Sequence, residues 1–201
     1  MAMERAAPPD RGRRRELGWL AAGYAGIAGF IALEGAARER GGGSSLDASA
    51  EDQGTTRLIV AAYGLAVGLP PLLRCPRLRR LPSPAAGLGL AVERAGLAIR
   101  FWSMRTLGAS YSRTLRTTDA QPVVDRGPYG WVRHPGYLGS LLTWTGFALT
   151  SQSLPTVVSI GGLLAWAYRR RIAAEEELLT RDLPGYLEYS RRTKKLIPFV
   201  W

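Results

Sequence analysis

The sequence predicts an all-α integral membrane protein, and its composition and patterning carry that prediction. Of the 201 residues 46% are hydrophobic, yet the formal net charge is +11. The two properties are segregated along the chain: arginines cluster at 11–15, 74–80, 100–116 and 169–171, whereas the stretches between are rich in Gly, Ala, Leu, Val, Ile and Trp. Apolar runs of helical length that alternate with basic segments are typical of membrane spans.

The same distribution argues against several other classes of protein. A basic nucleic-acid-binding protein interleaves Arg and Lys with aromatic residues on one exposed face, whereas here the aromatic residues lie inside or at the edges of the apolar runs. The single Cys75 cannot form an intrachain disulfide and has no metal-ligand neighbours. Gly87 and Gly89 neither follow a predicted strand nor continue to a third glycine, so no Rossmann nucleotide site is predicted.

Two N-terminal transmembrane helices are predicted after a polar, arginine-rich leader, residues 1–16, which we expect to be disordered. Residues 17–33 are uncharged and approach the about 20 residues that cross a bilayer. A flexible loop at 40–56 separates them from a second span at 58–73. The GxxxG motif at 64–68 indicates either a close helix–helix approach or ordinary packing of small residues.

The third apolar segment, residues 81–107, contains four charged residues: Glu93, Arg94, Arg100 and Arg105. Charges at membrane depth are costly unless they face a protein interior or a wet cavity. The segment therefore either spans the membrane with a functional polar face or lies partly along the interface.

The region 81–201 contains the most informative part of the chain. Residues 135–168 form an uncharged run of 34 residues. Two helices of about 16 residues each reach only about 24 Å against a hydrocarbon core of about 30 Å, which predicts a short helical hairpin that turns near 150–155. Both ends of a hairpin emerge on the same side. The segment before it therefore meets the segment after it, residues 169–179.

The segment before the hairpin, "RGPYGWVRHPGYLG", contains the only histidine of the chain, His134. Gly127-Pro128 and His134-Pro135 predict irregular backbone, which at a membrane surface is tolerated where it lines a buried or aqueous pocket. A histidine fixed there donates hydrogen bonds or serves as an acid or base, unless it merely caps the following helix.

The segment after the hairpin, "RRRIAAEEELL", is predicted to continue as a helix. Arg171 and Glu175 then share one face, and Ile172, Glu176 and Leu179 line the adjacent one. Three consecutive glutamates are unusual beside anionic headgroups. This arrangement favours a site for a cationic ligand over an ordinary solvated ion pair.

The succession of "GPYGWVRHPGYLG", an apolar hairpin, "RIAAEEELL" and "YLEYSRRTKKLIP" resembles the isoprenylcysteine carboxyl methyltransferase family and its relatives among the membrane phospholipid methyltransferases. The likeness covers residues 95–201. It implies an integral membrane enzyme that uses S-adenosyl-L-methionine, with the cofactor enclosed between the Arg-His-Pro segment and the helix that follows the hairpin. The stretch "RDLPGY" departs from the aromatic-Gly pair frequent in relatives.

The resemblance also implies roles for individual residues. Arg171 and Glu175 would be catalytic, with Arg171 holding an anionic acceptor. Tyr186, Tyr189 and Arg192 match a recurring C-terminal pattern. The expected cofactor-binding residues are Tyr129, Arg133, His134, Pro135, Tyr137, Gly139, Glu175, Glu176 and Leu179.

The expected chemistry is methyl transfer. S-adenosylmethionine carries a sulfonium and an ammonium, which favour acidic surroundings, and a ribose diol from which a carboxylate accepts two hydrogen bonds. Orientation and removal of water would be the protein's main contribution. The acceptor would be a lipophilic small molecule or lipid that enters from the bilayer. We expect O-methylation of a carboxylate, with a phospholipid amine or a small thiol as alternatives.

Two other functions remain open from the sequence. The sterol reductases have a similar C-terminal membrane hairpin, so an NADPH-dependent reductase is an alternative. A non-catalytic membrane protein whose arginines bind anionic lipid is another. For the methyltransferase we expect a prokaryotic cell membrane protein with five transmembrane helices and a site that faces the cytoplasm. The C-terminus is then inside and the N-terminus outside, although the arginine-rich leader alone favours the inside.

Overall fold

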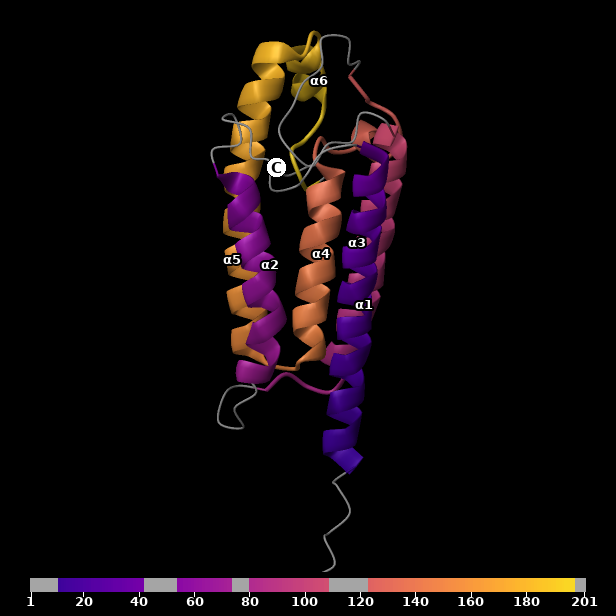
Figure 1. Ribbon diagram of the computed structural model, residues 1–201, viewed down its shortest axis with the longest axis vertical. Coiled ribbons are helices and arrows are strands. Elements are labelled where there is room, and N and C mark those ends of the chain that lie inside the picture. The colour runs from indigo at the N-terminus through magenta and orange to yellow at the C-terminus, as the bar shows by residue number, and fades with distance from the viewer. Residues whose placement is uncertain (1–10, 42–53, 74–79, 109–122, 198–201) are drawn as a thin grey trace, which may run out of the picture.

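The computed structural model describes residues 11–41, 54–73, 80–108 and 123–197, and five long helices run side by side in an elongated antiparallel bundle (Figure 1). The long helices are α1 (Arg11–Gly41), α2 (Thr55–Leu72), α3 (Pro84–Leu107), α4 (Pro135–Thr150) and α5 (Leu154–Asp182). A 3₁₀ turn, η3 (Gly127–Gly130), precedes α4, and a short helix, α6 (Tyr186–Arg192), follows α5. The described residues contain two isolated β-bridges but no strand, which agrees with the predicted all-α class.

The helix boundaries refine the sequence expectations. Residues 11–16, the end of the predicted disordered leader, are helical and belong to α1, and the rest of the leader lies outside the described residues. Most of the predicted loop at 40–56 and of the arginine cluster at 74–80, with Cys75, also lies outside them. The turn between α4 and α5 falls within the stretch for which the uncharged run predicts it.

One end of the bundle is defined by the α4–α5 turn. Leu81 N, just before α3, donates to Gln152 O at 2.8 Å, and Ser153 Oγ donates to Leu73 O at 3.2 Å. An ion pair between Arg80 and Glu16 brings the start of α1 to the same end. The starts of α2 and α4 therefore lie at the opposite end, together with the ends of α1, α3 and α5 and with α6 (Figure 1).

Helices α3 and α4 pack backbone against backbone through glycines spaced seven residues apart on each helix. A Cβ atom added at Gly89 would lie 2.7 Å from Gly146 O, and one added at Gly139 would lie 2.8 Å from Gly96 O. Only glycine permits this approach. The GxxxG motif at 64–68 plays no such part, because neither of its glycines has a neighbouring atom within 4 Å of an added Cβ.

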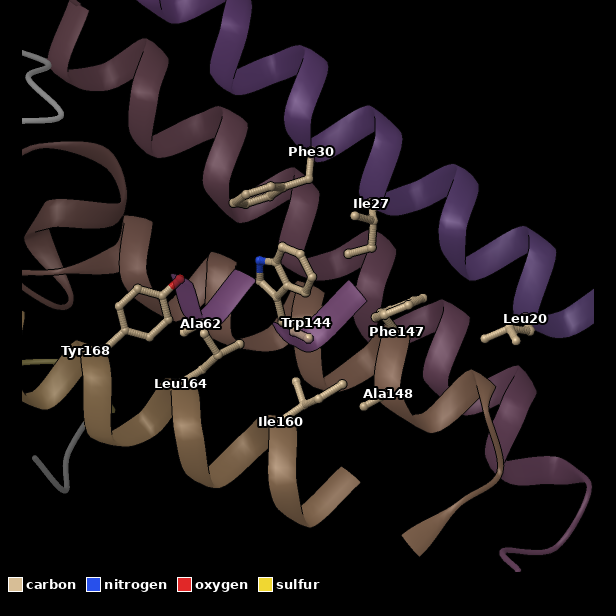
Figure 2. Packing of buried hydrophobic residues seen from close by; sticks show 11 residues of the cluster. Leu20, Ile27, Phe30, Ala62, Trp144, Phe147, Ala148, Ile160, Leu164 and Tyr168 are labelled. Atoms are coloured by element: carbon tan, nitrogen blue, oxygen red, sulfur yellow. The ribbon is translucent and has the colours of Figure 1, made fainter. Parts of the chain in front are cut away.

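Aromatic side chains from several helices form the core. Trp144 of α4 is almost fully buried, stacks on Tyr63 at 4.7 Å between ring centroids and meets Phe30 edge-on at 5.8 Å. Figure 2 shows this indole between Phe30 and Ile27 of α1 and the aliphatic side chains of α5. The core thereby joins the two N-terminal helices to the α4–α5 hairpin.

Two of the four charged residues of α3, Glu93 and Arg100, point into the bundle, whereas Arg94 and Arg105 are exposed. Arg100 Nε donates to Glu34 Oε1 of α1 at 2.8 Å, and both side chains are buried. Glu93 is fully buried against Gly26, and its carboxylate oxygens have no hydrogen-bond partner among the described residues. α3 is thus one continuous helix with an internal polar face.

Two of the described helical segments are long and apolar enough to cross a membrane by length and composition alone. They are Gly12–Ala36, with a mean hydropathy of 1.4, and Thr55–Leu72, with 1.2.

Candidate active site

The Arg-His-Pro segment is held in place by the C-terminal tail. After the 3₁₀ turn, Val132 forms a parallel bridge with Lys194. Arg133 N donates to Lys194 O at 2.8 Å, and His134 N donates to Lys195 O at 3.0 Å. Two segments some sixty residues apart thus satisfy each other's backbone groups, and α4 begins directly after them at Pro135.

His134 occupies the N-cap position of α4, but its side chain makes no capping hydrogen bond. Instead its Nε2 lies 3.0 Å from Glu176 Oε1, and its Nδ1 lies 4.0 Å from Glu175 Oε2. The ring is 4% exposed. The sequence-based alternative in which His134 merely caps the helix is therefore wrong.

Glu176 is held by several donors. Arg133 donates from Nε to Oε1 at 2.7 Å and from Nη2 to Oε2 at 3.2 Å, and Lys195 Nζ lies 3.3 Å from Oε2. Burial alone would raise the pKa of Glu176, but the hydrogen bonds and charges of His134 and Arg133 outweigh it and hold that pKa well below its usual range. Glu176 is thus an ionised anchor whose two oxygens are already engaged.

Arg133 joins three segments of the chain. Besides Glu176 of α5 it donates from Nη1 to the backbone carbonyls of Ser190, at 2.7 Å, and Thr193. Burial by itself would lower the pKa of Arg133, and the carboxylate of Glu176 more than offsets it, so the pKa lies above its ordinary value. The guanidinium therefore fixes the tail against α5.

The carboxylate of Glu175 is more exposed than that of Glu176 and has fewer donors around it. Tyr137 donates from its hydroxyl to Glu175 Oε2 at 2.6 Å, whereas Oε1 has no hydrogen-bond partner in the part of the chain that the structure describes. The Glu175 side chain is 26% exposed. One carboxylate oxygen is therefore oriented by the protein and the other is available to a ligand.

Arg171 lies beneath this pair and is 3% exposed. It donates from Nε to Tyr137 Oη at 3.1 Å and from Nη1 to Thr55 Oγ1 and Thr56 Oγ1 at 2.9 and 3.1 Å. The two threonines, at the start of α2, are site residues that the sequence reasoning missed. No local pattern marks them, because they lie more than a hundred residues from their partner.

A column of aromatic rings leads from the site into the core. His134 stacks on Tyr137 at 5.7 Å between centroids, and Tyr137 stacks on Tyr168 at 5.3 Å. The hydroxyls of Tyr168 and Tyr63 lie 2.6 Å apart. The position of Tyr137 is thereby fixed by packing as well as by hydrogen bonds.

The remaining predicted residues surround this centre. Tyr129 accepts a hydrogen bond at its carbonyl from Tyr189 Oη at 2.6 Å, and Pro135 is the first residue of α4. Gly139 faces the backbone of α3, and Leu179 packs against the buried side chains of the C-terminal tail. The fold thus brings together Arg133, His134, Tyr137, Arg171, Glu175 and Glu176.

The chain shares its fold with a solved membrane enzyme. The structure of the eukaryotic intramembrane Ras methyltransferase ICMT, solved without a monobody, superposes with a TM-score of 0.54 at 19% sequence identity. The superposition covers 72% of this chain and 52% of that one. The likeness shows that the two chains share a helical fold.

The family comparison points the same way. Residues 89–181, just under half of the chain, match the model of the isoprenylcysteine carboxyl methyltransferase (ICMT) family. This match spans most of α3, all of α4 and nearly all of α5, and it confirms the resemblance predicted from the sequence motifs.

The curated relatives include both a methyltransferase and a metal-resistance protein. Protein-S-isoprenylcysteine O-methyltransferase of Rattus norvegicus is 27% identical over 62% of this chain and 45% of its own length. Nickel-cobalt-cadmium resistance protein NccN of Alcaligenes xylosoxydans xylosoxydans is 28% identical over 55% of this chain and 47% of its own. The matches thus span less than half the length of these relatives.

Proposed function

We propose that this protein is an S-adenosylmethionine-dependent membrane methyltransferase that O-methylates a carboxylate on a lipophilic substrate. The observation that carries the proposal is the pair of neighbouring glutamates on α5. Both oxygens of Glu176 are engaged in holding His134 and Arg133, while Glu175 Oε1 has no hydrogen-bond partner among the described residues. The names of the relatives support methyl transfer as the reaction.

The residues present fit the cofactor that the family implies. Glu175 would accept hydrogen bonds from the ammonium or the ribose hydroxyls of S-adenosylmethionine through Oε1, because Tyr137 occupies only Oε2. When bound, the cofactor supplies an activated methyl group on a sulfonium. Glu176 orients His134 and Arg133, which would meet the carboxylate end of the ligand.

Arg171 would supply the positive charge that aligns an anionic acceptor. An unperturbed carboxyl has a pKa of about 4 and is ionised near neutral pH, so a carboxylate acceptor needs no general base. Thr55 and Thr56 hold the Arg171 guanidinium from below, and Tyr137 bonds its Nε. These contacts preorganise the charge, so that orientation and exclusion of water would provide most of the rate enhancement.

The five long helices would span a membrane, with the site at one surface. We propose a division into a leader at 1–16, N-terminal transmembrane helices at 17–80 and a methyltransferase core at 81–201. The site would face the cytoplasm, where the cofactor is made, and the acceptor would enter sideways from the bilayer. A bacterial relative supports a prokaryotic cell membrane.

Incubation of the purified protein with a lipid extract and methyl-labelled S-adenosylmethionine tests the proposal. Mass spectrometry should detect the label in an apolar product, as an ester cleaved by mild base. Label in an amine or a thioether would move the acceptor to the other methyl-transfer classes. Binding of NADPH in place of S-adenosylmethionine would instead identify a reductase, and binding of neither would leave a non-catalytic lipid-binding protein.

A further inference from the structure

A cavity of about 300 Å³ opens beside α6, at the end of the bundle that holds the candidate active site. Its lining consists of Arg133, Ser190, Arg191, Arg192, Thr193, Lys194 and Lys195. Five of these seven side chains are cationic and none is acidic. Such a concentration of positive charge around one cavity favours an anionic occupant.

Nearby carboxylates balance only part of this charge. Arg192 pairs with Asp125 at 2.9 Å, and Glu176 serves both Arg133 and Lys195. The other two cations of the lining, at positions 191 and 194, have no acidic partner in the part of the chain that the structure describes. The cavity therefore carries an uncompensated positive charge.

Two backbone carbonyls near the cavity are already engaged in hydrogen bonds. The carbonyls of Ser190 and Thr193 would repel negative charge, but Arg133 Nη1 donates to both. These contacts engage both carbonyls without neutralising the cations of the cavity. A phosphate group, with several acceptor oxygens, matches the donors that remain.

The cavity lies at the level where the chain enters the apolar bundle. Lys194 and Lys195 are bonded through their carbonyls to the residues directly before Pro135, the first residue of the uncharged run. Trp131 and Ile197, on the two paired segments, are 70% and 46% exposed. An exposed tryptophan beside lysines is typical of the membrane–water interface.

We propose that this cavity binds the phosphate of an anionic phospholipid headgroup from the surrounding bilayer. Lys194 and Arg191 would supply the charge, since the other cations are partly neutralised. Only Arg133 is common to this cavity and to the candidate cofactor residues. The lipid site is therefore independent of whether the protein transfers methyl groups.

Native mass spectrometry of the purified full-length protein in detergent tests the site. Phosphatidylglycerol should bind more tightly than phosphatidylcholine. Each basic residue near an anionic headgroup contributes about 1 kcal/mol, so Arg191→Gln/Lys194→Gln should weaken the first bound phosphatidylglycerol about thirtyfold. The single variant Lys194→Gln should lie between this variant and the wild type. Circular dichroism of each variant should match the wild type, because both side chains are exposed.

The matched control is Arg169→Gln/Arg170→Gln, which removes the same charge from exposed positions on α5. It should leave phosphatidylglycerol binding within about twofold of the wild type. An equal loss in the two double variants would overturn the site and leave only unspecific surface charge. Displacement of the lipid by an equal concentration of glycerol phosphate would overturn the lipid assignment in favour of a soluble phosphate.

Discussion

Glu175 and Glu176 are adjacent in the sequence, yet the fold gives them different tasks. The helical rotation between them turns Glu176 towards Arg133 and His134 and leaves Glu175 beside Tyr137. A third glutamate, Glu177, is exposed on the outer face. The run of three acidic residues thus contains an anchor, a ligand candidate and a solvated neighbour, and Glu177 serves as a natural control for the other two.

The anchor role of Glu176 predicts a pH-dependent stability. Its pKa in the folded protein lies below the ordinary value of 4.5, so its contribution is complete above that pH and disappears as the pH falls further. Thermal unfolding in detergent should show that Glu176→Gln lowers the melting temperature near pH 7, with a deficit that narrows below about pH 4. Glu177→Gln should behave as the wild type. A deficit that persists unchanged at low pH would contradict the anchor role.

The proposed role of Arg171 predicts a kinetic signature once an acceptor is known. A lysine cannot reproduce the planar set of donors that serves an acceptor and Tyr137 together. Arg171→Lys should therefore lose most of the turnover with little change in cofactor affinity, and the wild-type rate should stay nearly flat from about pH 6 to 8. A rate that rises about tenfold per pH unit, with an unimpaired lysine variant, would indicate an amine or thiol acceptor.

At the residue scale the sequence motifs indicated most of the side chains that the fold brings together at the candidate site. Spaced motifs and helical periodicity identified His134, Arg171 and the two glutamates. They did not separate the buried anchor from the free carboxylate, because that distinction depends on which helix face meets Arg133. Nor did they indicate Thr55 and Thr56, whose contact with Arg171 exists only after α2 has packed on α5.

Among the helices, α3 and α4 form a close contact that depends on glycine. The two pairs of glycines bring the backbones together, and α3 in turn presents Glu93 to Gly26 of α1. An unpartnered buried carboxyl is costly, and here it occupies the space that a side chain on α1 would need. Position 26 therefore accommodates only glycine, because the Glu93 carboxylate fills the space that a Cβ atom would need.

This contact predicts a coupling between two substitutions. Gly26→Ala should destabilise the protein by about 1–3 kcal/mol, because the new methyl overlaps the Glu93 carboxylate. In a Glu93→Ala background the same substitution should cost less than about 0.5 kcal/mol. Gly29→Ala, which meets nothing within 4 Å, is the control and should be neutral or slightly stabilising. Denaturation by a graded detergent series measures all four variants, and additive costs would disprove the contact.

The hairpin was predictable from the sequence and the glycine contact was not. The uncharged run predicted the start of α4 and the turn before α5 within a few residues, whereas α5 continues beyond the run to Asp182. Glycines are frequent throughout the apolar segments, so their spacing alone did not reveal which pairs meet. The GxxxG motif of α2 illustrates the difficulty, because it satisfies the pattern although no atom lies within 4 Å of a Cβ added at either glycine.

At the scale of the whole molecule, helices outside the family match complete the site. Residues 89–181 match the family model, yet α1 contributes Glu34 to the buried pair with Arg100, and α2 contributes the threonines that hold Arg171. The antiparallel order also places the start of α1 and the C-terminal tail at opposite ends (Figure 1). Charge alone does not predict these opposite ends, because the arginine-rich leader favours the cytoplasmic side, where the C-terminal tail is also expected.

The opposite ends give a topology prediction. In a Cys75→Ser background, a single cysteine introduced at exposed Arg13 should react with an impermeant maleimide added outside intact cells. A cysteine at exposed Glu188 of α6 should react only after the cells are opened. Reaction of position 188 from outside would place the site on the wrong face for a cytoplasmic cofactor.

Calorimetric titration of the purified protein with S-adenosylmethionine tests the central claim most directly. The wild type should bind the cofactor, and Glu175→Gln should weaken binding about 10- to 100-fold, because a charge-assisted hydrogen bond contributes about 1.5–3 kcal/mol. Glu177→Gln, the same change one exposed position further along α5, should bind as the wild type does. Absence of binding to the folded wild type, or equal affinities in all three proteins, would contradict the account.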